Sequence, residues 1–397
     1  MRRDFGRGAY LLEAGCPSEA IYLVRNGYVR IFLLAEDGRE TTTAILGPGQ
    51  LVGVTPLLGE DVHHEFAQAL TRVEVWALSM RRSRDSLAED QILRGLVLGS
   101  LAQRFAVAVA LLRDVALLPV AERVHDIETR LTASLRGSPL ALKRTTLAGL
   151  VQARPETLAR AHPIARPLAR RAVSGPKAQA GIDSANWVFQ KGHVLLEADL
   201  PAGHAGRVVS GEVQVSVAGA GDRQMVVEYL DGGDLFGIGA LLGMPPAGIR
   251  LTALSDGEVE LLSGGELLRR LADEPTALGP LLSRLGWRLE QLERRLARAA
   301  APEASQRLMD LLRELAARDP QPRPGGARVV PGGWSHAALA HQIGVSRETV
   351  TRALAELSGA GAIRRQGRRI LVVSGLRGLR SDGGGRREPS GDCRSSA

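Results

Sequence analysis

The chain has 397 residues, of which 44% are hydrophobic and only 4% aromatic, so it can form two to four domains whose cores are mostly aliphatic. A formal net charge of +8 favours an anionic partner such as nucleic acid, although only three of the 51 basic residues are lysine and this bias can reflect codon composition alone. The two cysteines, Cys16 and Cys393, lie near opposite ends of the chain and cannot form an iron–sulfur or zinc site on their own, because such sites need about four ligands. Neither a signal peptide nor a run of about 18 apolar residues is present, so we expect a soluble cytoplasmic protein with no membrane contact and no cofactor.

The chain repeats itself at an offset of 184 residues. GAYLLEA at 8–14 lies over GHVLLEA at 192–198, and the alignment needs no gap over roughly 125 residues. The offset then becomes 192, so that LAGLVQARPETLARA at 147–161 matches LAHQIGVSRETVTRA at 339–353. The extra residues fall in the Pro/Gly-rich stretch 318–333, which has the composition of a loop. Agreement over this length predicts an internal duplication.

Each copy opens with short alternating segments. Residues 22–34 and 208–217 alternate with period 2 around Asn-Gly and Ser-Gly turns, the pattern of β-hairpins. Several such strands at short spacing indicate a β-roll or barrel. We assign one sensor-like β-roll to residues 1–88 and a second to residues 186–272.

A long helix follows in each copy, at residues 89–118 and 273–300. The second helix spaces its leucines 4-3-4-3-4, which is a heptad seam: Leu278, Leu282, Leu285, Leu289, Leu292 and Leu296. The equivalent seam of the first helix is weaker: Arg94, Leu98, Leu101, Phe105, Ala108 and Leu112. The seams favour pairing between helices, with packing on the helix's own domain as the alternative.

The second copy ends, at residues 301–375, in a pattern that is typical of DNA-reading modules. Residues 334–344 form an expected helix that stops at Gly344, and residues 345–357 form a second helix with Ser346 as its N-cap. Residues 358–373 then alternate around a Gln-Gly turn like a two-stranded wing. Helix, turn, helix and wing in this order predict binding to DNA. Residues 376–397 are expected to be a disordered tail.

The second of these helices carries side chains that suit the major groove. Arg347 and Arg352 can donate paired hydrogen bonds to guanine, and Glu348 can accept from cytosine. Hydroxyl groups suited to phosphates are those of Ser346, Thr349 and Thr351, and wing arginines suited to phosphates are Arg364, Arg365, Arg368 and Arg369. Residues 335–380 hold eight arginines against two glutamates, a formal +6. The alternative is an ordinary solvated helix face.

The first copy carries an interrupted version of this module at residues 119–165. Arg154, Glu156 and Arg160 keep the chemistry of the reading helix. Two prolines, Pro163 and Pro167, then end the helix, and a Pro/Ala/Arg-rich linker at 166–185 stands in place of a wing. This copy either binds DNA phosphates without recognising bases or has lost its function, and the sequence leaves both possibilities open.

The Gly-rich β-roll stretches and SRETVTRAL at 346–354 resemble the Crp/Fnr superfamily of bacterial transcription regulators, over nearly the whole chain and as two tandem copies. The resemblance implies an α+β fold in which each copy has a cyclic-nucleotide-binding-type β-roll, a dimerisation helix and a helix–turn–helix, winged in the second copy. It also implies double-stranded DNA and RNA polymerase as partners. By the same resemblance, Arg347, Glu348 and Arg352 match base-reading positions.

The effector pockets depart from the family pattern, in which a Gly-Glu-Leu cassette is followed by an Arg-Ser pair. The first copy has Gly53, Val54, His63 and His64 at the key positions, and the second has Gly237, Ile238, Ala247 and Gly248. A buried cyclic phosphate without a cation is unfavourable, and Arg250 could substitute only if its loop shifted. We therefore expect no cyclic-nucleotide binding by the usual mode. The two histidines favour a solvated loop over a metal or haem site.

These patterns predict a sequence-specific DNA-binding transcription regulator that reads DNA chiefly through its second copy. The two long helices are expected to pair within the chain as a pseudo-dimer, with a homodimer as the alternative. The rival function is a ligand-sensing or scaffolding protein that has lost specific DNA binding. An enzyme is the least supported function, because the sequence shows no nucleophile–base set, P-loop or metal-ligand spacing.

Overall fold

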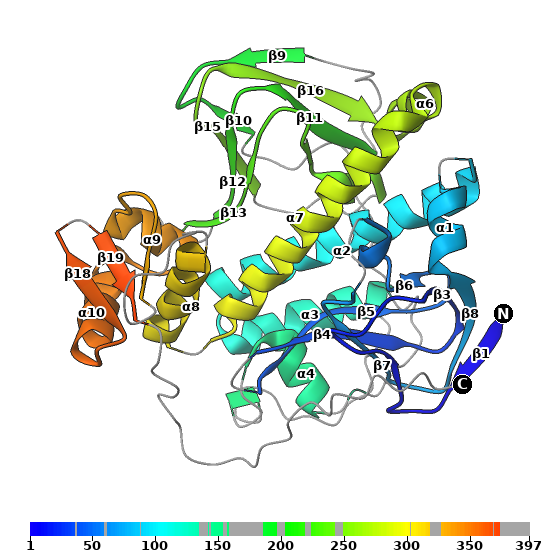
Figure 1. Cartoon of the computed structure of the whole chain (residues 1–397), viewed down its shortest axis with the longest axis horizontal. Coiled ribbons are helices and arrows are strands. Elements are labelled where there is room, and N and C mark those ends of the chain that lie inside the picture. The colour runs from blue at the N-terminus through cyan, green and yellow to red at the C-terminus, as the bar shows by residue number, and fades with distance from the viewer. Residues whose placement is uncertain are drawn as a thin grey trace. The chain divides into compact units, whose positions relative to one another are not determined.

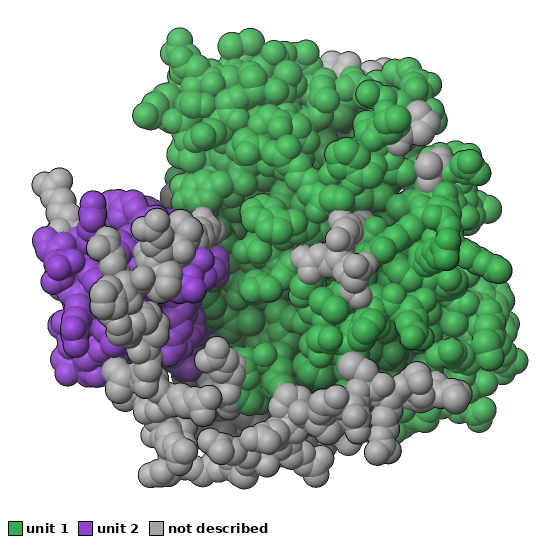
Figure 2. Space-filling view, in the orientation of Figure 1, with its two compact units in different colours: residues 1–300 green, residues 301–397 purple. Residues whose placement is uncertain are grey.

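The computed structural model describes residues 1–35, 38–58, 62–87, 89–134, 142, 144–153, 157–158, 186–196, 203–218, 224–242, 249–301, 303–317, 327–367 and 369–373. They belong to two compact units, residues 1–300 and 301–397, coloured separately in Figure 2. The expected linker at 166–185 and the expected tail at 376–397 lie outside the described residues.

The first β-roll consists of two antiparallel four-stranded sheets, ordered β1-β8-β3-β6 and β2-β7-β4-β5 (Figure 1). Alternate residues of β8 show why the chain folds this way: Val73 and Val75 are fully buried, whereas Glu74 between them is not. The strands are β1 Arg2–Phe5, β2 Tyr10–Leu12, β3 Ala20–Asn26, β4 Val29–Leu34, β5 Glu40–Leu46, β6 Leu51–Val52, β7 Phe66–Ala69 and β8 Val73–Ser79, with a 3-10 turn η1 at Thr55–Leu58.

The second β-roll repeats this plan, with sheets ordered β14-β11-β16-β9 and β10-β15-β12-β13. Even the irregularities recur: the pairing of β3 with β8 shifts between Val24 and Asn26, and that of β11 with β16 shifts between Val208 and Ser210. The predicted duplication is therefore confirmed. The strands are β9 Asn186–Phe189, β10 Val194–Leu196, β11 His204–Ser210, β12 Val213–Ala218, β13 Gln224–Leu230, β14 Leu235–Phe236, β15 Ile249–Ala253 and β16 Gly257–Ser263, with η2 at Ile238–Leu242.

The predicted hairpin turns each need a glycine. Gly27 and Gly211 have φ angles of 86° and 87°, in the left-handed region. A Cβ atom on Gly27 would lie 2.2 Å from the Arg72 carbonyl oxygen, and one on Gly211 would lie 2.6 Å from that of Asp256. Both conformation and space therefore require glycine at the equivalent turns.

Two long helices form the centre of this unit, α2 Gln91–Leu117 and α7 Leu278–Ala299 (Figure 1). They pack against each other, and all six seam leucines of α7 are buried. Asp90 caps α2 by accepting hydrogen bonds from the backbone N–H groups of Ile92 and Leu93. Residues 91–116 are long and apolar enough to cross a membrane, but most of this segment is buried inside the protein, as in a core helix.

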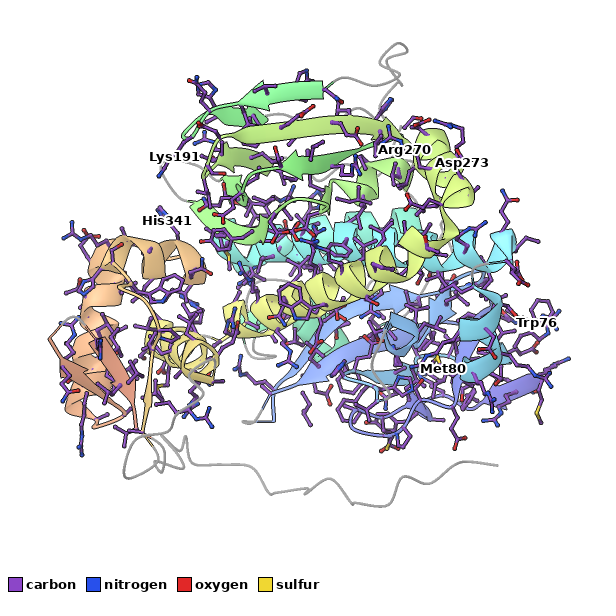
Figure 3. The ribbon with its side chains drawn as sticks, turned by 45° about the horizontal axis from the view of Figure 1, so that its top comes forward. Trp76, Met80, Lys191, Arg270, Asp273 and His341 are labelled. Atoms are coloured by element: carbon purple, nitrogen blue, oxygen red, sulfur yellow. The ribbon has the colours of Figure 1, made fainter. Side chains whose placement is uncertain are left out.

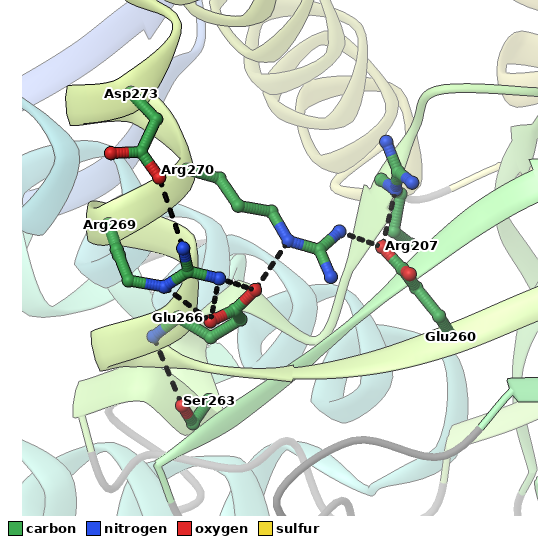
Figure 4. A network of polar contacts seen from close by, with 7 residues as sticks. All are labelled: Arg207, Glu260, Ser263, Glu266, Arg269, Arg270 and Asp273. Atoms are coloured by element: carbon green, nitrogen blue, oxygen red, sulfur yellow. Dashed lines mark hydrogen bonds and ion pairs between the residues drawn. The ribbon is translucent and has the colours of Figure 1, made fainter.

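Short helices connect the β-rolls to the long helices: α1 Met80–Ser86 in the first copy, and α6 Gly264–Asp273 followed by the 3-10 turn η3 Pro275–Ala277 in the second. Ser263 caps α6, and Arg270 joins Glu266 to Glu260 of β16, with N–O distances of 2.7 and 2.6 Å (Figure 4). Arg207 of β11 reaches the same Glu260 oxygen at 2.7 Å. The first copy has the half-exposed Trp76 at the position of Glu260 (Figure 3), so this polar network belongs to the second copy.

The first copy continues with α3 Val120–Ser134 and α4 Arg144–Val151, both within the unit of residues 1–300. The second copy continues, in the unit of residues 301–397, with α8 Ala304–Ala317, α9 His336–Ile343 and α10 Arg347–Gly359. A three-stranded sheet completes that unit in the order β17-β19-β18, from β17 Arg328–Val329, β18 Ile363–Gln366 and β19 Arg369–Val372. The predicted hairpin of the wing is β18–β19, and β17 is a third strand that the sequence did not indicate.

Candidate nucleic-acid interface and effector pockets

The reading helix α10 begins at the predicted N-cap. The Ser346 hydroxyl accepts a hydrogen bond from the backbone N–H of Thr349 at 3.2 Å, and Gly344 makes the preceding turn with a left-handed φ of 66°. Arg347 and Arg352 are exposed, whereas Val350 and Leu354 are buried in the core of this unit. The helix therefore packs through one face and presents its guanidinium groups on another.

Glu348 lies in the first turn of α10, where it stays ionised. Hydrogen bonds from its own backbone N–H and from Ser346, together with the neighbouring Arg347, lower the pKa of its carboxyl below the ordinary value. An ionised carboxylate only accepts hydrogen bonds, which suits a cytosine amino group. Its side chain is exposed, so it is free to face a ligand.

His336, at the start of α9, connects the reading helix to the wing. Its Nδ1 is 2.9 Å from Thr351 Oγ1, and its Nε2 is 2.9 Å from Arg365 Nη2. Arginine only donates, so Nε2 accepts this hydrogen bond and Nδ1 is the ring nitrogen that faces the Thr351 hydroxyl. Thr351 in turn donates to the Arg347 carbonyl at 3.0 Å. Thr351, which the sequence suggested for phosphate, thus has an internal role, and His336 was missed because its partners lie 15 and 29 residues away.

The wing presents the remaining predicted arginines. Arg364, Arg365 and Arg369 are exposed on β18 and β19, while Ile363 and Ile370 of the same strands are buried in the core. Alternation along the two strands therefore separates a basic face from an apolar one. Arg368 lies outside the described residues.

The first copy keeps the start of the same module. α4 corresponds residue for residue to α9 at offset 192, and Gln152 has a left-handed φ of 54° at the position of Gly344. It is the one non-glycine residue with positive φ among those that the structure describes. The turn also keeps its hydrogen bond: the Ala153 N–H donates to the Ala148 carbonyl at 3.0 Å, as the Val345 N–H does to the Ala340 carbonyl at 3.1 Å. Arg154, Glu156 and Arg160 lie outside the described residues.

In the first effector pocket, the cassette residues and the first histidine lie close together and are buried. Gly53 adopts a left-handed φ of 79°, and a Cβ atom there would lie 3.2 Å from the His63 ring, so cassette and histidine are in contact. Val54 is fully buried at the position where the family resemblance implied a glutamate. The expectation that the two histidines form a solvated loop is wrong, because His63 is only 3% exposed and burial lowers its pKa, so its ring is neutral. His64 Nδ1 lies 3.7 Å from Glu290 of α7.

A buried ion triad adjoins these histidines. Arg104 of α2 donates from Nη1 to Glu65 at 3.0 Å and from Nη2 to Glu293 of α7 at 2.6 Å, and each of the three side chains is at most 5% exposed. Burial and the neighbouring Glu65 raise the pKa of Glu293 while Arg104 opposes that shift. The triad joins the first β-roll to the helices of both copies.

The second effector pocket is lined by Gly237 and Ile238 of the cassette, by Phe105 of α2 and by Glu228 and Arg288. The cavity between these side chains has a volume of about 30 Å³, which is room for roughly one or two water molecules. Arg250 lies on β15, where its carbonyl oxygen accepts a hydrogen bond from Ser216 of β12 at 3.5 Å, and it does not line the cavity. Ala247 and Gly248 lie outside the described residues.

Arg288 of α7 occupies the position of Arg104 in the repeat. Its guanidinium donates to Glu228 at 2.9 Å, lies 3.5 Å from Asp234, and stacks 5.4 Å from the Phe105 ring of α2. Burial raises the pKa of Asp234 to about 6, with Arg288 opposing and Glu228 adding to the shift. Within the described ranges, no group of three or more His, Cys, Asp or Glu side chains is placed to hold a metal ion.

Sequence reasoning missed Arg104 and Glu65, and it gave no internal role to Arg288 or Glu293, which flank the leucine seam. One signal could have found the two arginines. They stand at equivalent repeat positions, 184 residues apart, in the middle of helices whose inward positions are mostly apolar. A charge repeated at one site of two buried helices indicates an internal partner in each copy of the duplication.

Comparison with known proteins agrees with this architecture. The family model described as a cyclic nucleotide-binding domain matches residues 2–90 and 187–274, one match for each β-roll. The model described as a Crp-like helix-turn-helix domain matches residues 306–381.

Individual relatives align with part of the chain. A CRP-like cAMP-activated global transcriptional regulator of Mycobacterium tuberculosis is 26% identical over 184 residues, which are 46% of this chain and 82% of that protein. A cyclic AMP receptor protein of Thermus thermophilus is 39% identical over 77 residues, 19% of this chain and 36% of that protein. A solved structure of a CRP/FNR-family transcriptional regulator, also from Thermus thermophilus, covers 48% of this chain and 94% of its own, at 26% identity and a TM-score of 0.34.

Proposed function

The chain belongs to the Crp/Fnr superfamily of transcription regulators, and we propose that it binds DNA sequence-specifically, chiefly through α10 of its second copy. The observation that carries this proposal is the first turn of α10, where Arg347 and Arg352 are exposed on a capped helix and Glu348 is ionised beside them. An exposed helix N-terminus with these donors and this acceptor suits base edges in the major groove.

The wing supports the same function. Arg364, Arg365 and Arg369 supply exposed positive charge beside α10, and phosphate contacts from such residues provide affinity that does not depend on sequence. The two ring nitrogens of His336 form hydrogen bonds with Thr351 of the reading helix and Arg365 of the wing, so they link these two elements. Base contacts and backbone contacts thus come from one rigid module.

The long helices support an intramolecular pseudo-dimer. α2 and α7 come from different copies and bury their apolar seams against each other within one chain. Regulators with one copy of this unit per chain use such helices to join two chains in a homodimer. In the proposed pseudo-dimer, a single chain supplies both helices. RNA polymerase is a further partner that the family membership suggests.

The two effector pockets support regulation without a bound cyclic nucleotide. The cassette positions hold Val54 and Ile238, both buried and apolar, and each pocket faces an arginine that is already neutralised by carboxylates. A cyclic phosphate would have to displace these internal ion pairs and enter beside a glutamate.

Selection of bound fragments from random DNA tests the function directly. The wild-type chain should enrich a defined motif, and replacing Arg347 and Arg352 by alanine should abolish that preference, because guanine contacts of this kind give about 1–3 kcal/mol of discrimination each. A charge-matched control replaces Arg81 and Arg82, exposed on α1, and should keep the motif. If the reading-helix variant keeps its selectivity, the rival function of a sensor or scaffold without specific DNA binding is favoured.

A further inference from the structure

The first helix of each helix–turn–helix is buried to a different extent in the two copies. In the first copy all of residues 146–152 are buried, including Gly149. In the second copy His341, which stands at the position of Gly149, is exposed (Figure 3). α4 therefore has a neighbour on the face that α9 leaves open within its own unit.

That neighbour is β5 of the first β-roll, which α4 contacts directly. A Cβ atom built on Gly149 would lie 2.9 Å from Thr42 Oγ1, 3.1 Å from an Arg30 guanidinium nitrogen and 3.3 Å from the Glu40 carbonyl oxygen. Real Cβ atoms almost never approach closer than 3.0 Å. The glycine thus permits a close approach of helix to sheet that any larger residue would disturb.

Arg30, Glu40 and Thr42 form a polar platform under α4. Arg30 is only 3% exposed and donates to Thr42 Oγ1 at 2.7 Å and to Glu40 at 2.6 Å. The other end of the contact is also polar, because the Gln152 amide donates to the Thr42 carbonyl at 3.4 Å. The turn after α4 and the middle of α4 are therefore both held to the same strand.

The second copy lacks both sides of this contact. Gln214, Gln224 and Val226 stand at the platform positions, so neither the cation nor its hydroxyl partner is present. His341 replaces Gly149, and its side chain is too large for the space that the glycine leaves. The docking of α4 on β5 is therefore specific to the first copy.

The apolar contacts of α4 and α9 also differ between the two copies. Leu147, Leu150 and Val151 of α4 belong to the core that contains α2 and α7. Leu339 and Ile343 of α9 belong to a separate core within residues 301–397. The first helix–turn–helix shares the core of the β-roll unit, whereas the second one has a core of its own.

We infer that the first helix–turn–helix is held against its β-roll, an arrangement that we call the brace, and that it does not act as a second DNA-reading module, or head. The chain would then recognise one DNA half-site. Palindromic sites require two heads placed alike about a twofold axis, with half-sites about 10–10.5 bp apart. The first helix–turn–helix is fixed to its β-roll by contacts that the residues of the second copy cannot make. The two modules therefore do not meet the requirement of equivalent placement about a twofold axis. This inference rests on the proposed function for its DNA target, whereas the brace itself does not.

Hydrogen exchange of the full-length protein tests the brace without DNA. Gly149→His should speed amide exchange in residues 144–151 and in β5 by about tenfold or more, because the helix must leave the strand. His341→Gly, the matched change in the other copy, should leave exchange in those residues unaltered. Gly149→Ala covers the case in which the histidine variant does not fold, and it should give a smaller change of the same sign. Unchanged exchange in α4 of both Gly149 variants overturns the brace.

Selection from random DNA tests the half-site. The wild-type chain should yield one asymmetric motif, and replacing Arg154 and Arg160 by alanine should change affinity for it by less than about twofold, against a loss of about tenfold or more for the Arg347 and Arg352 variant. A palindromic motif, or an equal loss from the Arg154 and Arg160 variant, overturns the single-head inference. If no motif is selected at all, the proposed function fails while the exchange result still decides whether the brace exists.

Discussion

Arg104 and Glu293 lie in different copies of the repeat, and their side chains form a buried ion pair with an Nη2–Oε1 distance of 2.6 Å. Because Glu65 binds the other edge of the same guanidinium, one cation holds two carboxylates. The pair connects α2 to α7 at a point where neither side chain meets solvent. It is therefore a buried polar link between the two copies, in an interface where the leucine seam of α7 packs against α2.

Replacing Arg104 by methionine should destabilise the unit of residues 1–300 strongly. The change removes the only cation of the triad and leaves Glu65 and Glu293 buried side by side, and loss of one partner from a buried ion pair costs about 3–5 kcal/mol. Denaturant unfolding followed by far-UV circular dichroism measures the loss. The triple variant with Glu65→Gln and Glu293→Leu removes the uncompensated charges as well, so it should recover most of the stability. A loss below about 1 kcal/mol for the single change would show that the triad is not intact in solution.

The triad also predicts a pH dependence of stability. The folded state raises the pKa of Glu293 above its ordinary value, chiefly by burial, so between the ordinary and the raised value the folded chain binds more protons than the unfolded chain. The free energy of unfolding should therefore fall as pH rises through that window. Asp234, whose pKa is raised to about 6, adds a contribution of the same sign.

Glu293→Gln isolates the contribution of the triad. The amide cannot ionise, so the variant should be more stable than the wild type above the raised pKa and equal to it in acid, with the largest slope difference about 1.4 kcal/mol per pH unit. Thermal or urea unfolding measured from about pH 4 to about pH 8 gives both curves. Asp234→Asn serves as the control at the other pocket. Parallel curves for wild type and Glu293→Gln would contradict a proton bound in the triad.

The parts that the sequence predicted correctly share a local cause. The turn glycines, the Ser346 cap and the seam leucines each follow from the conformation or periodicity of a few neighbouring residues. The repeat supports the turn glycines a second time, because Gly27 and Gly211 are equivalent. Membership of the family followed from the same local patterns. The detailed domain boundaries and the base-reading roles of Arg347, Glu348 and Arg352 stay predictions.

The parts that the sequence did not predict depend on distant partners. Arg104 and Glu293 are 189 residues apart in the chain, and no local pattern relates them. Arg288 flanks the leucine seam of α7 in the sequence, and its burial depends on carboxylates from the second β-roll that no local pattern reveals. His63 was assigned to a solvated loop because no residue near it in the sequence completes a metal site. Burial of polar groups is decided by tertiary partners, and a single sequence does not reveal them.

The buried seam predicts the mass of the protein in dilute solution. If α2 already covers the leucines of α7 within one chain, sedimentation should give a monomer of about 42 kDa at micromolar concentration. Leu285→Asp should then lower thermal stability without changing the mass, because the seam it disrupts is internal. A firm dimer that Leu285→Asp splits into monomers would show that α7 pairs between chains.

The side chains at the two effector pockets predict the response to cyclic AMP. A ligand stabilises a protein by about 2.7 kcal/mol at a hundred times its dissociation constant, so binding would raise the melting temperature measurably. We expect no shift with millimolar cyclic AMP, because the second pocket has a cavity of only about 30 Å³ and places Glu228 beside it. Glu228→Gln, which removes the repelling charge, is the variant to compare. A clear shift in the wild type would contradict this expectation.

The N-cap of the reading helix allows its stability to be separated from its contact with DNA. Ser346→Ala removes the acceptor for the Thr349 N–H and should cost about 1 kcal/mol in the unit of residues 301–397. Ser346→Asp keeps an acceptor and adds a negative charge next to the helix N-terminus, so folding stability should be retained. The same charge faces a DNA phosphate if α10 enters the groove, so affinity for DNA should fall for the aspartate variant more than for the alanine variant. Titrations at two salt concentrations measure this difference, which should shrink as salt screens the charge. Equal affinities for the two variants would mean that the N-terminal turn of α10 does not approach the DNA backbone.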